Sequence, residues 1–256
     1  EVFVHGAMCI SYSGRCLLSN FLTGRSANKG NCAHTCRWKY KVYLEEENRP
    51  NEFMQLDEDE HGAYVMNSRD LCLMPRLNEL LDVGLDSFKI EGRNKSEYYV
   101  SVTARAYRKA IDDWAQDPKN WIPDEYMREL STLQNRGYTL GFFDGNAGPE
   151  SLNYEISASG GAWRYAGRII EKTDDAVVLE IKHKIEKGDE LEFLSPYQFD
   201  PIKIKVADFY DSANGKSLDV ISTGHLGQSI RLPMSKDVLD KLETYCVARK
   251  FIGQNA

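Results

Sequence analysis

The sequence predicts an α/β region followed by an all-β region. Two observations predict this fold class. In the first half, short apolar runs alternate with amphipathic helical patterns, as in parallel βα units. In the last third, short alternating runs are separated by turn-like residues, as in a small antiparallel β-barrel. The 256 residues and 42% hydrophobic content are enough for two domains with cores of their own.

The first half contains three expected strands and two expected helices. Residues 2–5, 63–67 and 86–92 have the β-branched and aromatic character of short strands. One helix is expected to start at Ser68 or Asp70 and to end at Gly84. Its leucines recur at helical spacing: Leu71, Leu73, Leu77, Leu80 and Leu81. A second, longer helix is expected over about 96–114, with an apolar stripe on one side.

These units are too few to close a barrel. A (βα)8 barrel of the TIM type takes about 250 residues, so we expect the segment to be its C-terminal part, with the other half upstream of Glu1. Residues 1–117 are assigned to this part. Residues 118–160 are read as a short helix, about 124–133, and a linker. Residues 161–256 form the predicted β-barrel domain, with six expected strands.

Composition limits the partners and the location. Thirty-two basic and 39 acidic residues are interspersed and leave a net charge of −7. The overall charge therefore does not attract nucleic acid, and any contact with RNA would have to be local. No stretch has the roughly 20 consecutive apolar residues of a membrane span. No basic and apolar leader precedes the first motif. We therefore expect a cytoplasmic protein without a membrane partner.

Four cysteines near the start are the most specific motif. They have the spacing C-x6-C-x15-C-x3-C: Cys9, Cys16, Cys32 and Cys36. Thiolates at such spacing indicate a [4Fe-4S] cluster or zinc. The cluster is preferred because structural zinc sites more often have two CxxC knuckles, which the x6 and x15 gaps do not match. Structural disulfides are disfavoured in a chain that can build a core. Cys72 is an alternative fourth ligand, although its apolar neighbours favour a core position, as they do for Cys246.

Basic residues accompany the cysteines. They are Arg15, Arg25, Lys29 and Arg37. These cations either compensate the negative charge of a four-thiolate cluster or receive an anionic substrate. The sequence leaves both interpretations open.

A group of charged residues marks the third strand. Lys89, Glu91 and Arg93 alternate with apolar residues and therefore point to one side of a strand. At the C-terminal end of a barrel strand such residues do chemistry, where an arginine can bind a carboxylate or phosphate. The alternative is an internal salt-bridge layer. His5, at the end of the first strand, is a further catalytic candidate, with a structural role as its alternative.

The opening of the chain resembles the signature of the collagenase-like peptidases, family U32. The match holds at each fixed position of Glu1-x-Phe3-x-x-Gly6-Ala7-Met8-Cys9-x4-Gly14-x-Cys16-x-Leu18-Ser19. Later blocks resemble the branch of that family that acts in prephenate-dependent tRNA hydroxylation. They are NxGxCxxxCRWxY (28–40), EDEHGxYxMNSxDL (58–71), SFKIEGRxKSxYY (87–99), YRKAIDD (107–113) and RGYTxGF (136–142).

The resemblance implies a fold and a reaction. The fold is a TIM-like barrel followed by a small β-barrel like those of translation factors. The reaction is hydroxylation of the tRNA wobble uridine to 5-hydroxyuridine with prephenate as co-substrate, in an iron–sulfur protein whose cluster pattern matches the four cysteines. In one relative the last ligand lies near the place of Cys72. A collagenase-like peptidase is the alternative, and a zinc-stabilised RNA-binding module without catalysis is the second.

The residues themselves give peptidase chemistry little support. A cysteine peptidase pairs a thiolate with a base, and a metallopeptidase uses a motif such as HExxH, which is absent. His5 and His61 are the candidates for a base. If the four N-terminal cysteines hold metal, only Cys72 and Cys246 remain as nucleophiles, and both are expected to be buried.

The last domain carries a run of cations. They are Arg164, Arg168, Lys182, Lys184, Lys187, Lys203 and Lys205. An RNA-facing stripe is one interpretation. The interleaved acidic residues favour the other, an ordinary solvated β-barrel surface.

Overall fold

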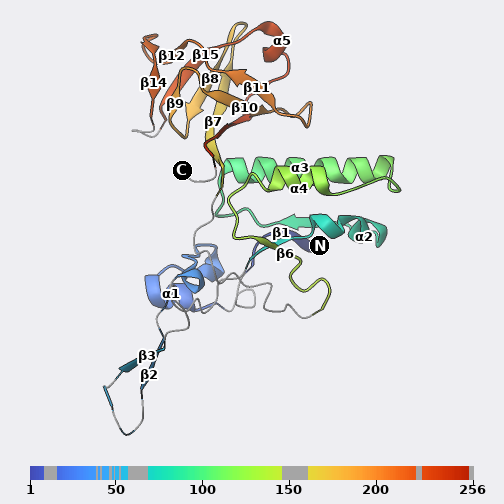
Figure 1. Ribbon diagram of the computed structural model, residues 1–256, viewed down its shortest axis with the longest axis vertical. Coiled ribbons are helices and arrows are strands. Elements are labelled where there is room, and N and C mark those ends of the chain that lie inside the picture. The colour runs from blue at the N-terminus through green and yellow to red at the C-terminus, as the bar shows by residue number, and fades with distance from the viewer. Residues whose placement is uncertain are drawn as a thin grey trace. The chain divides into compact units, whose positions relative to one another are not determined.

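The chain forms two compact units (Figure 1). The computed structural model describes residues 1–8, 16–38, 40, 42–45, 48, 50–51, 53–56, 69–145, 161–222 and 227–253. The first unit consists of Glu1–Arg93 and Asn135–Gly160, and the second of Asn94–Gln134 and Gly161–Ala256. Each unit is described by itself. Domain boundaries after residues 117 and 160 remain predictions.

The first unit contains a mixed four-stranded sheet in the order β5-β1-β4-β6. The strands are β1 (Val2–Ala7), β4 (Asp70–Cys72), β5 (Phe88–Ile90) and β6 (Tyr138–Thr139). β1 runs parallel to β5 and β4 runs parallel to β6, as βα units require. β1 and β4 are antiparallel, however, so the expectation of a purely parallel sheet is wrong for this pair. The βα-barrel itself stays a prediction.

The expected helix before Gly84 starts later than predicted. Asp70 and Leu71 lie in β4 because this segment pairs with β1 on one side and β6 on the other, which overrides its helical spacing. A 3-10 turn, η3 (Met74–Arg76), leads into α2 (Leu77–Asp82). Gly84, at φ +76°, follows the helix as expected. The strand predicted at 63–67 lies outside the described residues.

Short elements fill the rest of the first unit. Three belong to the cysteine-containing part: α1 (Leu18–Thr23), η1 (Ala27–Lys29) and η2 (Thr35–Arg37). A hairpin of β2 (Val42–Glu45) and β3 (Phe53–Leu56) follows, which the sequence did not predict. Val4, Met74 and Leu77 are fully buried and form part of this unit's core.

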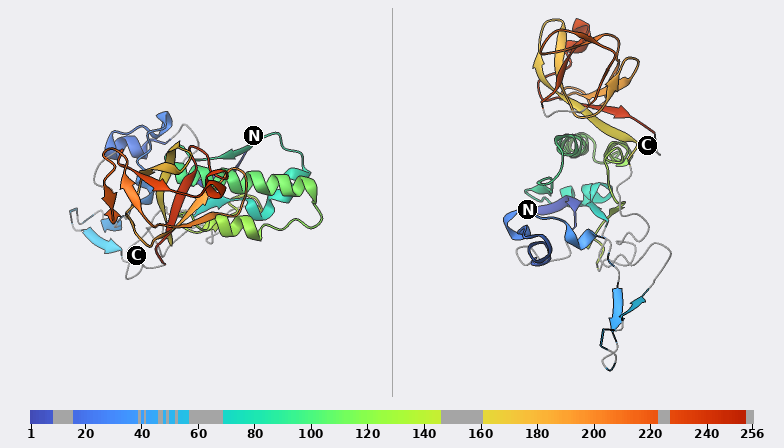
Figure 2. Two further views of the ribbon diagram at one scale, coloured as in Figure 1. Left: turned by 90° about the horizontal axis from the view of Figure 1, so that it is seen from above. Right: turned by 90° about the vertical axis from the view of Figure 1, so that its left-hand side faces the viewer.

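Two helices open the second unit and lie side by side in Figures 1 and 2. The long helix α3 (Glu97–Gln116) confirms the expectation for 96–114. Ser96 caps it by accepting the backbone N–H of Tyr99 at 3.2 Å. The helix α4 (Asp124–Leu130) is the expected short helix, three residues shorter at its end. Buried residues of both helices include Val102, Ala106 and Leu130.

The rest of the second unit is a curled antiparallel sheet, seen along its curl in the right-hand view of Figure 2. Its eight strands follow the order β11-β10-β16-β7-β8-β15-β12-β13. Their bounds are β7 (Trp163–Lys172), β8 (Ala176–Ile181), β10 (Glu190–Leu194), β11 (Ile202–Lys205), β12 (Phe209–Asp211), β13 (Ser217–Leu218), β15 (Ser229–Pro233) and β16 (Val247–Phe251). The sheet confirms the all-β part of the predicted fold class.

Two details of this sheet differ from the six expected strands. The expected strands at 202–210 and 216–222 each split into two. The first gives β11 and β12. The second gives β13 and β14 (Val220–Ile221), and β14 pairs with β9 (Ile185–Glu186). β16 was not predicted, because its charged Arg249 and Lys250 hide its strand character. The short helix α5 (Lys236–Leu239) precedes it.

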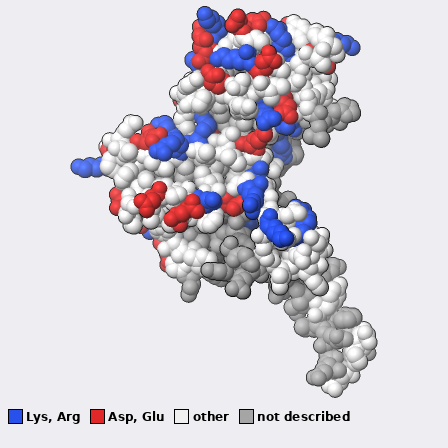
Figure 3. All heavy atoms as spheres, turned by 180° about the vertical axis from the view of Figure 1, so that it is seen from behind, with Lys and Arg blue, Asp and Glu red and all other residues white. Residues whose placement is uncertain are grey.

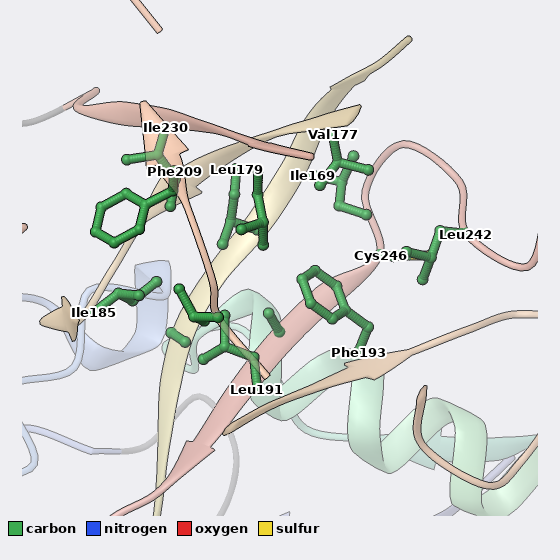
Figure 4. Close-up of a cluster of buried hydrophobic side chains, with 14 of the residues drawn as sticks. Ile169, Val177, Leu179, Ile185, Leu191, Phe193, Phe209, Ile230, Leu242 and Cys246 are labelled. Carbon is green, nitrogen blue, oxygen red and sulfur yellow. The ribbon is translucent and has the colours of Figure 1, made fainter. Parts of the chain in front are cut away.

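The core of the second unit lies inside the curl of the sheet. Side chains from β7, β8, β10, β12 and β15 meet there, as Figure 4 shows for Ile169, Leu179, Phe193, Phe209 and Ile230. All five are fully buried. Among the helices that the structure describes, none combines the length and the hydropathy that crossing a membrane requires.

Candidate functional site

Residues 16–38, here called the cysteine segment, fold as one small body around Ser19. The Ser19 hydroxyl donates to the carbonyl of Arg25 at 2.8 Å and accepts the backbone N–H of Ala33 at 3.0 Å. This joins α1 to the turn that follows it and to the loop that carries Cys32. The backbone N–H of Cys16 donates to Oδ1 of Asn28 at 3.1 Å, which fixes the start of the segment.

Three of the predicted cluster ligands lie in this segment. Cys16 precedes α1 and is half-buried, Cys32 lies between η1 and η2 and is half-buried, and Cys36 lies in η2 and is buried. The sulfur of Cys32 accepts the backbone N–H of His34 at 3.3 Å. Cys9, the first of the four cysteines, lies outside the described residues.

Two arginines brace the segment through hydrogen bonds to backbone carbonyls and to one side-chain amide. Arg25 donates from Nε to Oδ1 of Asn31 at 2.9 Å and from Nη2 to the carbonyl of Cys32 at 3.3 Å. Arg37 donates from Nη2 to the carbonyl of Met8 at 2.7 Å, next to Cys9 in the chain. Their charges therefore stand beside the predicted ligands.

Arg93 reaches the cysteine segment from a distant part of the sequence. Its guanidinium packs against Gly30, and an ideal Cβ on residue 30 would lie 2.9 Å from Nε and closer still to Cζ and Nη1. Gly30 has φ +78°, a conformation that glycine adopts without strain. Glycine at position 30 therefore allows the approach of Arg93.

His5 and Cys72 are opposite each other on neighbouring strands. They are paired residues of the antiparallel β1–β4 ladder, and both are about 1% exposed. The ring of His5 lies 5.4 Å from the ring of Tyr138, centroid to centroid. Directly opposite residues have side chains on the same face of a sheet. The sheet therefore places a predicted catalytic histidine beside the alternative fourth ligand.

Glu91 lies against the end of β1. Its backbone N–H donates to the carbonyl of His5 at 2.8 Å. A Cβ on Gly6, which has φ +138°, would lie 2.6 Å from Cβ of Glu91, so only glycine fits there without a shift. This explains the need for glycine at position 6 in physical terms.

The three charged residues around β5 do not form a salt-bridge layer. β5 ends at Ile90, so only Lys89 lies in the strand, and Glu91 and Arg93 follow it. Lys89 and Arg93 are exposed and Glu91 is half-buried. Glu91 accepts the backbone N–H of Arg93 at 3.1 Å, and none of the three forms an ion pair within the described part of the chain. Two cations next to β1 thus remain open to an anion.

Among the described residues no three side chains of His, Cys, Asp or Glu are grouped as metal ligands. That search does not include Cys9 or His61, which lie outside the described residues. None of the described cysteines is in a disulfide. The assignment of the four cysteines to a cluster, and of Cys36 rather than Cys72 as the fourth ligand, stays a prediction.

The cations of the sheet in the second unit are mostly neutralised, as the interleaved red and blue atoms at the top of Figure 3 show. Five of the seven cations named above form ion pairs: Arg168, Lys182, Lys184, Lys187 and Lys203. Lys187, for example, has both Asp208 at 3.2 Å and Asp219 at 2.8 Å. These contacts favour an ordinary solvated surface over an RNA-facing stripe.

Sequence reasoning missed the residues that hold the segment together. Ser19 and Asn28 carry its central hydrogen bonds, and Gly30 receives Arg93. The one signal in the sequence was the glycine at position 30, just before Asn31 and Cys32, because glycine is the residue that most readily forms a left-handed turn. Nothing local predicts that Arg93, 63 positions further on, packs there.

The mixed sheet, the cysteine segment and the curled sheet together belong to a known family. Residues 1–153 match the family model described as "Peptidase family U32", and residues 162–243 match "Peptidase family U32 C-terminal domain". The first match covers more than half of the chain. The chain therefore belongs to peptidase family U32, which confirms the resemblance seen at its start.

Among its curated relatives are proteins of two kinds. The chain is 33% identical to "tRNA hydroxylation protein P" of Escherichia coli (strain K12), over 99% of this chain and 63% of that protein. It is 34% identical to "tRNA hydroxylation protein P1" of Bacillus subtilis (strain 168), over 93% of this chain and 56% of that protein. It is 31% identical to "Collagenase" of Porphyromonas gingivalis (strain ATCC BAA-308 / W83), over 77% and 47%. The chain thus spans less than two thirds of each relative.

A solved structure also matches. It is the C-terminal domain of a putative U32 peptidase of Geobacillus thermoleovorans, in its selenomethionine variant. Identity is 20% and the TM-score is 0.29, with 34% of this chain and 99% of that chain covered.

Proposed function

We propose that the chain is part of an iron–sulfur protein that acts in the prephenate-dependent hydroxylation of the tRNA wobble uridine to 5-hydroxyuridine. One observation carries the proposal. The cysteine segment with its bracing arginines lies in a chain that is similar over nearly its whole length to two tRNA hydroxylation proteins. A tRNA substrate would place the activity in the cytoplasm.

Four cysteines with arginines near them have the chemistry that a [4Fe-4S] cluster needs. Cys9, Cys16, Cys32 and Cys36 would hold it, and the N–H of His34 already supports the sulfur of Cys32. The charges of Arg25 and Arg37 would offset part of the negative charge of four thiolates. When bound, such a cluster supplies one-electron chemistry, with a potential set by hydrogen bonds, charge and exposure.

The strand ends supply the other proposed roles. Exposed Lys89 and Arg93 would bind the carboxylates of prephenate, Arg93 through its planar fork. Glu91, held at the end of β1, would orient Arg93, whose backbone N–H it accepts. His5 would move a proton at its imidazole, from a buried position next to Tyr138. The upstream part of the predicted barrel would complete the site.

A deletion strain tests the proposal. The gene for the full-length protein is deleted, and total tRNA nucleosides are measured by mass spectrometry. We expect 5-hydroxyuridine to disappear and to return with the wild-type gene. The Cys32→Ser variant is expected not to restore it, because serine keeps the hydrogen bond from His34 but is not a soft ligand.

Cys246→Ser is the matched control for this experiment. Cys246 is a buried cysteine of the second unit, and burial raises the pKa of its thiol. Its sulfur accepts the N–H of Glu243 at 3.3 Å, which serine can also do. The variant is expected to restore 5-hydroxyuridine. Unchanged modification in the deletion strain would disprove the proposed function.

Proteolysis is the second candidate, favoured by His5 standing opposite Cys72 and by the name of the collagenase relative. A nucleophilic cysteine must be reachable by substrate, and Cys72 is 1% exposed, so we rank this activity lower. It predicts gelatin cleavage by purified full-length protein that is lost in Cys72→Ala and kept in Cys32→Ser. Absence of cleavage in the wild-type protein removes the candidate.

A further inference from the structure

We propose that the exposed side of the cysteine segment binds single-stranded RNA, through phosphate contacts to its cations and base stacking on its aromatic side chains. The inference rests on the proposed function, since it states how the same region would receive its substrate. The RNA nucleotides that flank the reacting uridine would lie on this surface.

The charge of this part of the chain is unlike the rest. Between Glu1 and Glu45 there is no acidic residue, in a chain whose net charge is −7. The same stretch contains six cations: Arg15, Arg25, Lys29, Arg37, Lys39 and Lys41. Even if all four nearby cysteines are thiolates, six positive charges exceed four negative ones, before any charge of iron is counted. Even after the charge of the four thiolates is neutralised, this part of the chain therefore keeps a net positive charge.

The cations that the structure describes are open to solvent or nearly so. Arg25 and Lys29 are exposed and Arg37 is half-buried. None of the three is within ion-pair distance of a carboxylate in the described part of the chain, where ion pairs of other cations are common. Arg25 uses Nε for the side chain of Asn31 and Nη2 for the carbonyl of Cys32, and keeps further N–H groups for a phosphate. Such a surface attracts a phosphate backbone.

Aromatic side chains stand on the same small body. Phe21 in α1 is 84% exposed, and Trp38, at the end of η2, is 47% exposed. α1 is tied to the loop before η2 by the bond from Ala33 to Ser19. Burying aromatic rings is favourable, so two exposed rings among cations indicate a ligand with flat faces. Cations together with exposed aromatic rings are the usual means of binding a single strand.

A binding titration tests the surface. Full-length protein is titrated with a labelled, unmodified RNA stem-loop whose loop contains uridine, at about 50 and 200 mM salt. The Arg25→Gln/Lys29→Gln variant is expected to bind about tenfold more weakly at the lower salt concentration. Its plot of log K against log salt should be flatter by about 1.4, because each phosphate contact to a single strand contributes about 0.7.

Lys205→Gln/Lys216→Gln is the matched control. Both lysines are exposed residues of the second unit without ion pairs in the described part of the chain, and the change in net charge is the same. This variant is expected to bind the RNA like the wild-type protein. Equal weakening by both double variants would show a general charge effect and overturn the proposal.

Further variants separate charge from bracing and stacking from hydrophobic contact. Arg25→Lys keeps the charge but loses the two-pronged brace, so its RNA affinity should stay within a few-fold of wild type. If the double variant does not fold, Lys29→Glu alone carries the test, because the Lys29 side chain is exposed and makes no hydrogen bond or ion pair among the described residues. Phe21→Leu should weaken binding about tenfold and Phe21→Trp should preserve it, since stacking contributes about 1–3 kcal/mol per base.

The outcomes distinguish this proposal from the function on which it rests. Normal RNA affinity of both Arg25→Gln/Lys29→Gln and Phe21→Leu overturns the proposed surface, even if 5-hydroxyuridine still depends on the protein. If Phe21→Leu instead lowers the melting temperature of the full-length protein without changing affinity, the ring is covered by protein, and the proposal is again wrong. Loss of RNA binding in these variants supports the surface whatever the reaction proves to be.

Discussion

The cysteine segment and the curled sheet differ in how their cations are partnered. In the sheet, Arg168, Lys182 and Lys187 each have a carboxylate within about 3 Å. In the cysteine segment, Arg25 and Arg37 donate to backbone carbonyls and Lys29 has no carboxylate partner among the described residues. These cations of the sheet are therefore neutralised by carboxylates of the same unit. The described cations of the segment have no carboxylate partner in the described part of the chain, so their charge is available to a ligand.

This difference shows that the number of cations is a poor guide to binding. The sheet contains the run of lysines that suggests RNA binding in the sequence. Neighbouring carboxylates form ion pairs with most of these lysines and neutralise their charge. The segment has fewer described cations and no acidic residue from position 2 to position 44. A local absence of acids therefore identifies the electropositive region better than a local excess of bases.

The largest effect is expected from the buried ion pairs of the second unit, where a cation is fully committed to carboxylates. Arg249 of β16 is 3% exposed and donates to Glu192 of β10 at 2.8 Å and to Glu129 of α4 at 3.1 Å. Arg249→Met would leave both carboxylates buried without this partner. We expect a loss of about 3–5 kcal/mol in the free energy of unfolding, measured by urea denaturation.

Arg231→Gln is the control for this substitution. Arg231 pairs with Asp175 at the surface, where water screens both charges, so its loss should change the unfolding free energy far less. Adding Glu129→Gln and Glu192→Gln to Arg249→Met should recover part of the lost stability. If Arg249→Met and Arg231→Gln lower the unfolding free energy equally, the buried ion pairs of Arg249 contribute no more to stability than a surface pair.

The next test concerns the approach of Arg93 to Gly30. Gly30→Ala would push the guanidinium away, and Gly24→Ala has the same left-handed backbone with open space around it. Both substitutions should cost about 1–2 kcal/mol of stability from backbone strain. Only Gly30→Ala should also lower 5-hydroxyuridine in cells, by about tenfold, because it misplaces a proposed binding group.

Nucleoside analysis of the complemented deletion strain measures this effect. Arg93→Lys serves as a second variant, since it retains the charge but not the planar fork. If Gly24→Ala and Gly30→Ala restore modification equally, the position of Arg93 has no part in the reaction.

The smallest expected effect is on pH dependence in the second unit. Burial, together with Lys250 and Arg164, lowers the pKa of His183, and Asp189 opposes this only in part. The unfolded chain therefore binds a proton more readily than the folded one. Stability from this source is present above the usual pKa of histidine, near 6.5, and declines as the pH falls below it.

His183→Gln should remove this contribution. Urea denaturation at pH 7.5 and 5.5 should show a smaller loss of stability in the variant than in the wild-type protein. The difference is expected to be well below the effect of Arg249→Met. An identical loss in both proteins would mean that other groups set the pH dependence.

The sequence predicted those parts of the fold in which local pattern and tertiary environment agree. α3 has a long apolar stripe and a capping serine at Ser96, and it forms as expected. β4 was read as the start of a helix because a three-residue strand is too short to show a period of its own. β16 was missed because Arg249 is charged, and only the facing Glu129 and Glu192 make its burial possible.

The same distinction applies to the candidate site. The cysteine motif and the charged residues near β5 were recognisable because their spacing in the chain carries the information. The pairing of His5 with Cys72 and the packing of Arg93 on Gly30 join positions more than 60 residues apart. Such contacts depend on strand pairing and backbone conformation, which a local pattern does not contain.

Two buried cysteines, one from each region, provide the most direct test of the account. Cys36 lies in the cysteine segment and Cys246 in the second unit, and both are less than 10% exposed. Iron and acid-labile sulfide are measured in anaerobically purified full-length wild-type, Cys36→Ser and Cys246→Ser proteins. We predict about four iron and four sulfide per chain in the wild-type and Cys246→Ser proteins, and loss of both from Cys36→Ser. Zinc without sulfide in the wild-type protein, or an intact cluster in Cys36→Ser, would contradict the account.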